Sequence, residues 1–157
     1  MPTTGQRIEP PSATVADLHG HRVRSAYVGT VTQRVNVSSG SEFEAAVGYS
    51  RAVRTGPHVV VAGTTAPGDG PAAQTREALR RIETALKQVN ASLSDVVRTR
   101  IFVTDIEAWR EVGSVHAEVF GDIRPVTTMV EVSSLISPDL VVEIEVEPTA
   151  RHVTGLR

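Results

Sequence analysis

A long amphipathic helix is the strongest pattern in the sequence, and it spans residues 70–90. Its inner side chains recur at spacings of four, three, four and three. They are Thr75, Leu79, Ile82, Leu86 and Val89. Pro71 suits the first helical position, where its missing N–H would have had no partner. A helix with one such face predicts an apolar sheet beneath it.

Strand patterns lie on both sides of this helix. Residues 48–56 and 57–65 are short extended runs, and Gly56-Pro57 between them predicts a hairpin. Residues 96–103 alternate as a half-buried strand does, with Val97, Thr99, Ile101 and Val103 on one side. Two further strands are predicted at 126–132 and 140–146.

A second helix is predicted between the strands at 96–103 and 126–132. Thr104 and Glu107 have the spacing of a capping box at its start. We expect its inner face to carry Trp109, Val112, His116 and Val119 or Phe120. Gly121 is expected to end it as a left-handed cap.

This order of elements predicts an α+β fold, in which a single-layer mixed β-sheet has two helices packed on one face. The strand near residues 58–63 is apolar on both sides, so we expect other subunits to cover the second face. We interpret residues 1–40 as an N-terminal extension, partly irregular. Residues 41–150 form the domain, and residues 151–157 a C-terminal tail.

Composition limits the function classes. The 157-residue chain has a formal net charge of −2, which gives no general attraction to nucleic acid. It has no cysteine, so disulfides, thiolate metal sites and a cysteine nucleophile are excluded. Neither a signal peptide nor a membrane span is visible, and we expect a cytoplasmic protein without membrane contact.

His116 and the arginines of the first helix have ordinary structural interpretations. A single histidine on an apolar helix face is usually packed and hydrogen-bonded, and metal sites need several convergent ligands, so no metal is expected. Arg76, Arg80 and Arg81 fit a solvated helix face better than an RNA-binding patch.

Several motifs in a fixed order resemble those of the RidA/YjgF family. They are GYSRAVRTGPHVVVAGTT, AQTREALRRIETAL, SLSDVVRTRIFVTD, HAEVFGDIRPVTTMVEV and VVEIEVEP, and together they cover about residues 48–148. This family of reactive intermediate deaminases also carries the names endoribonuclease L-PSP and translation inhibitor. The resemblance implies a chorismate-mutase-like fold that assembles as a homotrimer with clefts between subunits.

The resemblance also implies a reaction and a set of site residues. Deaminating members hydrolyse imines and enamines to keto acids and ammonia without cofactor or metal. Glu143 matches the acidic residue associated with the catalytic water. Residues matching the substrate-binding positions or lying beside them are Tyr49, Gly63, Thr64, Phe120, Thr127 and Thr128. The residues alone allow ordinary structural interpretations as well. Tyr49 could cap a hairpin, and Gly63 could form a bulge. Phe120 could be a core residue, and Glu143 could be a solvated residue of a strand.

The sequence departs from the family at two of these positions. Thr127 stands where deaminating relatives carry the arginine that grips the substrate carboxylate, and Ala62 replaces a serine. Loss of that charged grip would weaken binding or rate by about 10- to 150-fold, so amino-acid-derived imines are expected to be poor substrates. Arg51 or Arg124 could stand in, but the sequence does not place either guanidinium.

Three functions are therefore considered. The first is a hydrolase that deaminates a reactive imine or enamine other than the usual amino-acid-derived ones. The second is a module of the same fold that binds a small metabolite without turnover. The third, RNA cleavage, is disfavoured by the charge and by aromatics of only 4%.

Overall fold

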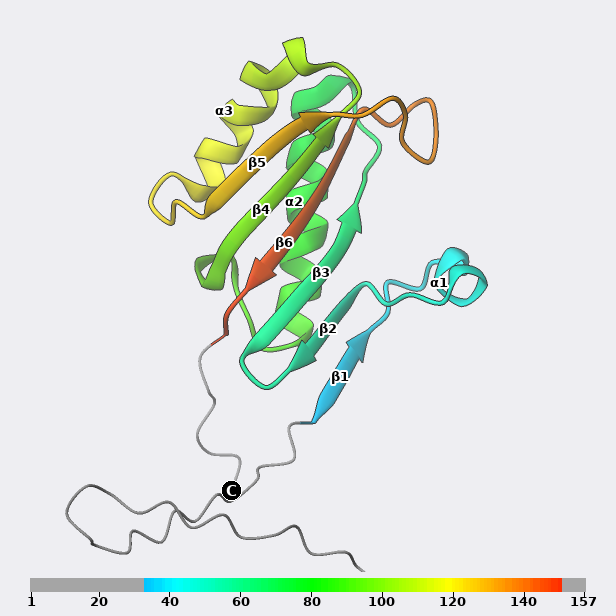
Figure 1. Ribbon diagram of the computed structural model, residues 1–157, viewed down its shortest axis with the longest axis vertical. Helices are drawn as coiled ribbons and strands as arrows, with labels where there is room; N and C mark the ends of the chain where they lie inside the picture. Colours follow the sequence, from blue (N-terminus) through cyan, green and yellow to red (C-terminus); the bar gives the residue numbers. More distant parts are fainter. Residues whose placement is uncertain (1–32, 151–157) are drawn as a thin grey trace, which may run out of the picture. The chain divides into compact units, whose positions relative to one another are not determined.

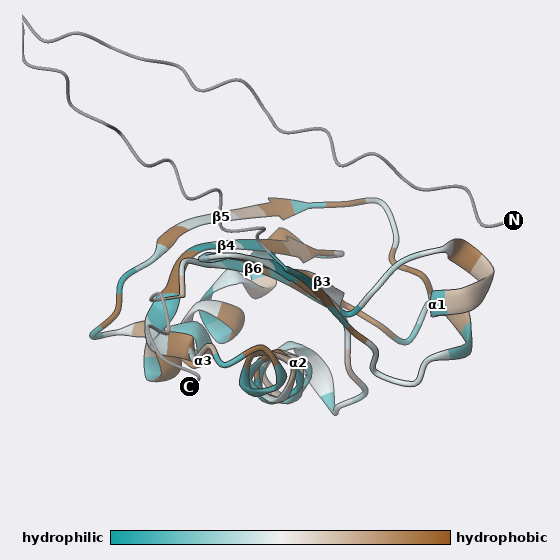
Figure 2. Ribbon diagram, turned by 90° about the horizontal axis from the view of Figure 1, so that it is seen from below, coloured by the Kyte–Doolittle hydropathy of each residue, from teal (hydrophilic) through white to brown (hydrophobic). Residues whose placement is uncertain are grey.

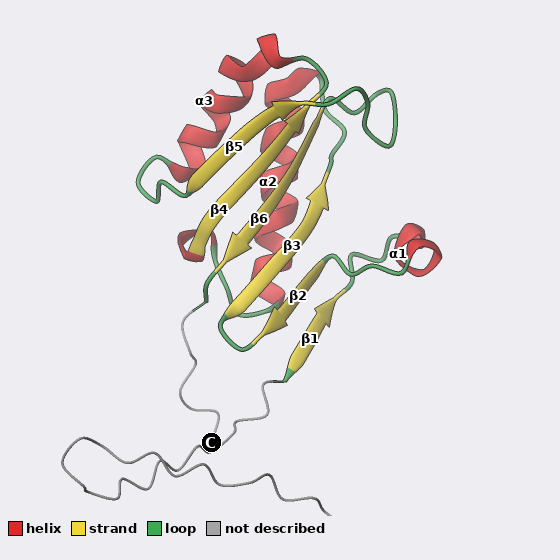
Figure 3. Ribbon diagram, in the orientation of Figure 1, coloured by secondary structure: helices red, strands yellow, loops and turns green. Residues whose placement is uncertain are grey.

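The computed structural model describes residues 33–150. They form one six-stranded sheet in the order β1-β2-β3-β6-β4-β5 (Figures 1 and 3). The strands are β1 Arg34–Val37, β2 Ala52–Thr55, β3 His58–Thr64, β4 Val96–Val103, β5 Val126–Glu131 and β6 Val142–Pro148. Strand β5 pairs with β4 in parallel, and every other pair is antiparallel. The mixed sheet confirms the predicted fold class.

Two long helices cover one face of the sheet, as Figure 2 shows from the end of the helices. They are α2 Gly70–Gln88 and α3 Trp109–Phe120. The predicted inner face of α2 is confirmed, since its five residues from Thr75 to Val89 are all buried. Among residues 33–150, no element covers the opposite face, which we call the open face.

The short elements mark the ends of strands. Helix α1 Glu42–Val47 follows β1 and ends at Gly48, whose φ of 81° is left-handed. Two 3-10 turns, η1 Leu93–Asp95 and η2 Ile106–Ala108, precede β4 and α3. The sequence patterns did not predict α1, because six residues are too few to show helical periodicity.

Three details of the second helix differ from the prediction. Asp105, not Thr104, caps the turn before α3, because its side chain accepts from the Glu107 N–H. Trp109 is 47% exposed and so does not belong to the inner face. Gly121 has φ −54° and continues the right-handed backbone, whereas Arg124 adopts φ 52° in the turn before β5.

Irregular pairing at two strands decides where side chains point. The register of β4 against β6 shifts between Val96 and Arg98, so Val97 is exposed, although Thr99, Ile101 and Val103 face the helices as predicted. The register of β3 against β6 shifts between Val61 and Thr64. Gly63 lies inside this second irregularity, which agrees with its interpretation as a bulge.

Candidate functional site

Glu143 and Gly63 lie in direct contact on neighbouring strands β6 and β3. A Cβ built on Gly63 would come within 2.0 Å of the Glu143 carboxylate oxygen Oε1 and within 2.8 Å of its Cδ. Real side chains do not approach so closely, so only glycine allows the carboxylate to lie over the β3 backbone here. The strand irregularity thus creates the place in which Glu143 is held.

Arg51 approaches the same position from the start of β2. Its Nη1 donates to the Gly63 carbonyl oxygen at 2.8 Å and to Thr64 Oγ1 at 3.0 Å. Its guanidinium carbon is 5.8 Å from the centroid of the Tyr49 ring, within the range of a cation–π contact. Arg51 thus connects Tyr49 and Thr64 to Gly63, and its positive charge acts on the Glu143 carboxyl.

The environment of Glu143 favours its neutral form. Burial raises the pKa of this carboxyl, and the negative charge of Glu145 raises it further, while the Arg51 guanidinium acts in the opposite direction. A carboxyl with a raised pKa exchanges protons more readily near neutral pH. The arrangement can therefore serve a reaction that needs one group to donate and accept protons.

Thr127 belongs to a second group, on the helix side of the sheet. Thr127 Oγ1 lies 2.8 Å from Thr99 Oγ1 and 3.1 Å from the Pro125 carbonyl oxygen. Thr99 Oγ1 in turn lies 3.1 Å from His116 Nε2, and the His116 ring packs on Phe120 with centroids 4.7 Å apart. His116 is thus packed and hydrogen-bonded, as its ordinary interpretation predicts, and burial lowers its pKa.

A single chain keeps the two groups apart. In the strand register, Glu143 is opposite Phe102 and Thr127 is opposite Thr99. Thr99 and Phe102 point to opposite faces of β4, so Thr127 and Glu143 do as well. Thr128, next along the strand, faces the open side opposite Arg100.

The structure separates exposed from buried members of the predicted set. Thr127 and Thr128 are exposed, and Tyr49, Gly63 and Glu143 are partly exposed. Thr64 and Phe120 are only 2% and 1% exposed. Within one chain the predicted substrate contacts of these last two are therefore not available; Thr64 positions Arg51, and Phe120 packs in the core.

The two arginines that could replace the missing grip lie in different places. Arg51 is beside Glu143, whereas Arg124 donates through Nε to the Gly121 carbonyl oxygen at the end of α3, 3.2 Å away. Sequence reasoning named Arg51 only as a possible replacement for the missing arginine, and it missed the role of Thr99. A threonine among the apolar positions of β4 was the available signal for Thr99.

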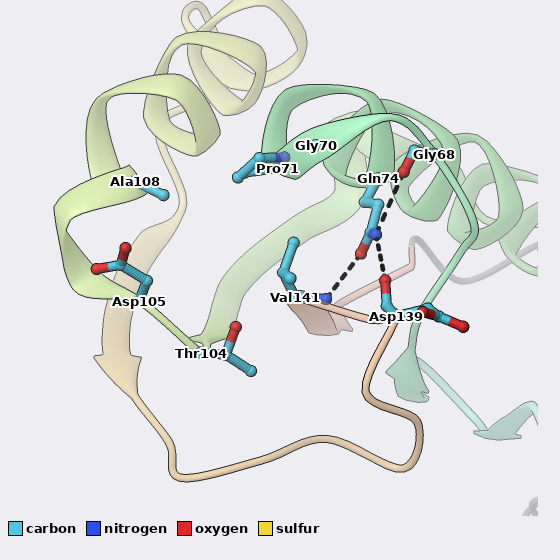
Figure 4. A pocket seen from close by; sticks show the side chains of 9 residues that line it. All are labelled: Gly68, Gly70, Pro71, Gln74, Thr104, Asp105, Ala108, Asp139 and Val141. Carbon is cyan, nitrogen blue, oxygen red and sulfur yellow. Dashed lines mark hydrogen bonds between the residues drawn. The ribbon is translucent and has the colours of Figure 1, made fainter.

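An open pocket of about 300 Å³ lies elsewhere, where the first turn of α2 meets the segment after β5 (Figure 4). Its lining contains none of the predicted site residues. The Gln74 side chain at its edge donates to Asp139 O and accepts from Val141 N, at 2.8 and 2.9 Å, so it braces this segment. The chemistry therefore favours the Glu143 group over this pocket as the candidate site.

Two features are absent from residues 33–150, a cluster of possible metal ligands and a helix suited to spanning a membrane. No group of three or more His, Cys, Asp or Glu side chains in this range could hold a metal ion. No helix in this range is both long and apolar enough to cross a bilayer.

The segment of the chain that matches known proteins includes both the Glu143 group and the Thr127 group. The family model described as Endoribonuclease L-PSP matches residues 39–149. The uncharacterized protein SCO2049 of Streptomyces coelicolor is 37% identical over 118 residues, which are 71% of this chain and 88% of that protein. The RutC family protein PYRAB12510 of Pyrococcus abyssi is 31% identical over 105 residues, 62% of this chain and 82% of that protein.

A solved structure is more similar still. The crystal structure of Rv2704 from Mycobacterium tuberculosis, described as a member of the YjgF/YER057c/UK114 family, superposes with a TM-score of 0.74 at 70% identity. The match covers 75% of this chain and 100% of that one. The β-sheet and helices that position Glu143 and Thr127 are thus shared with a solved relative.

Proposed function

Because the chain belongs to the endoribonuclease L-PSP family, also called the RidA/YjgF family, we propose that it hydrolyses the C=N bond of a small imine or enamine-derived imine. This family includes imine and enamine deaminases. The observation that carries the proposal is the half-buried Glu143 carboxyl, held against Gly63 with a raised pKa. The products would be a carbonyl compound and ammonia.

Glu143 can serve each proton transfer in turn. In its acid form it gives a proton to the imine nitrogen, and the carboxylate then takes a proton from water as the water oxygen bonds to carbon. The carbinolamine nitrogen receives the proton back and leaves as ammonia, while the hydroxyl proton returns to Glu143. The carboxyl ends as it began, and such positioned acid–base catalysis contributes about 10²- to 10⁴-fold in rate.

The substrate is proposed to lack a carboxylate at the place where deaminating relatives bind one. Thr127 occupies that position, and its hydroxyl cannot form the two-pronged contact of a guanidinium. Arg51 is close to Glu143, but one of its nitrogens is already bound to Gly63 O and Thr64 Oγ1. Thr127 and Thr128 are proposed to supply hydroxyl contacts instead.

The complete site is proposed to form between subunits of a homotrimer. Thr127 and Glu143 lie on opposite faces of one sheet, so they can line the same cleft only if different copies of the chain contribute them. The open face supports this, since Val60 and Val126 expose apolar surface there while α2 and α3 occupy the other side. A cytoplasmic location is part of the same proposal.

The test is an assay of purified full-length protein against imines made in place by amino acid oxidases and by amine oxidases, in competition with semicarbazide. We expect faster ammonia release from carboxylate-free imines than from amino-acid-derived ones, and loss of the effect in Glu143→Gln. Release no faster than buffer for every imine would contradict the proposal.

A binding module without turnover is the second candidate, and the observations that favour it are Thr127 and Ala62 at two family positions. It predicts thermal stabilisation by a carbonyl ligand with no product from any imine. Thr127→Arg separates the two candidates. Activity gained on amino-acid-derived imines would show that the remaining catalytic groups are competent.

RNA cleavage, which the family description names, has less support. The arginines on the exposed side of α2 pair with acidic neighbours: Arg76 with Glu118, and Arg80 and Arg81 with Glu77. Arg98 and Arg100 on the open face pair with Glu145 and Glu147. Paired charges give a phosphate backbone little to bind. Ribonuclease activity that survives further purification and disappears in Glu143→Gln would revive this candidate.

A further inference from the structure

The hydroxyl of Thr127 is committed to neighbours inside the protein. It has two hydrogen-bonding partners, Thr99 Oγ1 at 2.8 Å and the Pro125 carbonyl oxygen at 3.1 Å. The side chain of Thr99 is fully buried and continues the chain of contacts to His116 Nε2 at 3.1 Å. Three side chains and one backbone carbonyl thus form a continuous series from α3 to the edge strand β5.

The number of hydroxyl and ring protons in this series determines whether Thr127 can donate to a ligand or accept from it. A carbonyl oxygen only accepts, so the Thr127 proton goes to Pro125 O when that bond is made, and Thr99 then donates to Thr127. His116 Nε2–H must then donate to Thr99. In the reverse direction, Thr127 donates to Thr99, which donates to His116 Nε2. In both directions the single proton of Thr127 is used internally, and at least one lone pair remains.

We propose that Thr127 acts as a hydrogen-bond acceptor toward the substrate and selects one with a neutral N–H or O–H donor, such as a carboxamide, at this end. This specificity rests on the proposed imine hydrolysis, because it concerns the same cleft. A carboxylate also only accepts, so its oxygens and the Thr127 lone pair would face each other without a proton between them. The exposed Thr127 therefore does more than remove a carboxylate contact. The arginine of relatives donates hydrogen bonds to the substrate at this position, whereas Thr127 accepts one from it.

Thr99 and His116 are positioning residues in this proposal. They do not reach the ligand, since Thr99 is completely buried and His116 lies behind it against Phe120. Their effect is to keep the Thr127 proton occupied. The Thr99→Val variant removes one of the two internal partners of Thr127 while keeping the shape of the side chain.

The experiment measures binding of pyruvamide and pyruvate to the full-length protein by titration calorimetry or protein-observed NMR. The two probes have nearly the same shape, but only the amide offers N–H donors. We expect the wild type to favour pyruvamide and Thr127→Ser to keep the preference. Thr127→Val should reduce it about fivefold, the effect of one ordinary hydrogen bond. Thr127→Arg should reverse it in favour of pyruvate.

Thr84→Val is the matched control, because the Thr84 hydroxyl also donates to a backbone carbonyl, Arg80 O at 3.0 Å, on an exposed part of α2. Its preference should equal that of the wild type. Thr99→Val should lower the preference for pyruvamide without abolishing it. If Thr99 had a purely structural role, the substitution would weaken the binding of both probes equally. Circular dichroism of each variant verifies the fold.

The outcomes separate the inference from the proposed function. Equal preference in the wild type and in Thr127→Val, a wild type that favours pyruvate, or binding of neither probe at millimolar concentration would overturn the inference. A preference for pyruvamide without hydrolysis of any imine would support the inference about Thr127 and contradict the proposed hydrolase activity. Hydrolysis of imines without a preference that depends on Thr127 would support the hydrolase activity and contradict the inference.

Discussion

At the scale of single residues, the contact between Gly63 and the Glu143 carboxylate leaves no room for a side chain at position 63. We predict that Gly63→Ala lowers imine hydrolysis by about 100-fold, the size of loss that a displacement near 1 Å can cause at a reacting group. The added Cβ would otherwise lie 2.0 Å from Oε1, so the carboxylate must move. Stability should change little because the end of a flexible side chain can shift. Steady-state kinetics and thermal unfolding measure the two effects.

Gly113→Ala is the control for this change. A Cβ at Gly113, in the middle of α3, would meet nothing within 4 Å. The substitution should leave hydrolysis unchanged and raise the free energy of unfolding by about 0.5–1 kcal/mol, because glycine disfavours helix interiors. Equal activity loss in both variants would show that the Gly63–Glu143 contact has no special role.

The raised pKa of Glu143 predicts a pH-dependent stability effect. The native state binds a proton at this carboxyl more readily than the unfolded chain does. The contribution of Glu143 to the free energy of unfolding is therefore complete at low pH and is lost as pH rises through the pKa of the native state. Glu143→Gln should therefore gain stability relative to the wild type as pH increases above about 4.5, the ordinary value. Melting temperatures between pH 4 and 8 test this; a constant difference between the proteins would contradict it.

His116 has the opposite dependence. Burial lowers its pKa from 6.5, so the unfolded chain binds the proton more readily. Its contribution to stability is complete above pH 6.5 and is lost as pH falls toward the native pKa. His116→Gln keeps an N–H donor for Thr99 but cannot titrate, so its unfolding free energy should vary less between pH 7 and 5. Chemical denaturation at several pH values measures the difference.

At the scale of elements, Gln74 connects α2 to the segment that leads into β6. This buried side chain donates to Asp139 O and accepts from Val141 N (Figure 4). We predict that Gln74→Leu lowers the free energy of unfolding by about 1–3 kcal/mol per buried backbone group left without a partner. Gln88→Leu, at the exposed end of the same helix, should change it by about 0.5 kcal/mol or less. Urea unfolding distinguishes them.

The sequence allowed the long elements to be predicted but not their junctions. Periodicity depends on burial, so α2, the hairpin and β4 were visible. The ends of α3 depend on individual hydrogen bonds and dihedral angles, which is why Asp105 and Arg124 were missed as the cap and the positive-φ residue. The site shows the same limit. Family resemblance indicated Thr127 and Glu143, but the contact of Thr127 with Thr99 depends on a parallel register between residues 28 positions apart.

At the scale of the whole molecule, the open face determines whether the chain can function alone. It combines exposed Val60 with a network in which Arg100 pairs with Glu145 and Glu147 on the neighbouring strand. These charges already balance within one chain, so a second copy would have to bury apolar surface rather than complete an ion pair. Val60 is 51% exposed and its register places it beside Glu147, on this face.

We predict that Val60→Arg disrupts the proposed homotrimer and abolishes imine hydrolysis without unfolding the chain. The Glu147 carboxylate beside this position is already engaged by Arg98 and Arg100, so burying the new charge at an apolar interface costs several kcal/mol per copy, whereas an exposed arginine on a free monomer costs little. Val35→Arg is the control, because Val35 is also exposed but faces the helix side, opposite Arg54 on β2. Light scattering after size exclusion should give one third of the wild-type mass for the first variant only. A monomeric wild type that hydrolyses imines would show instead that one chain completes the site.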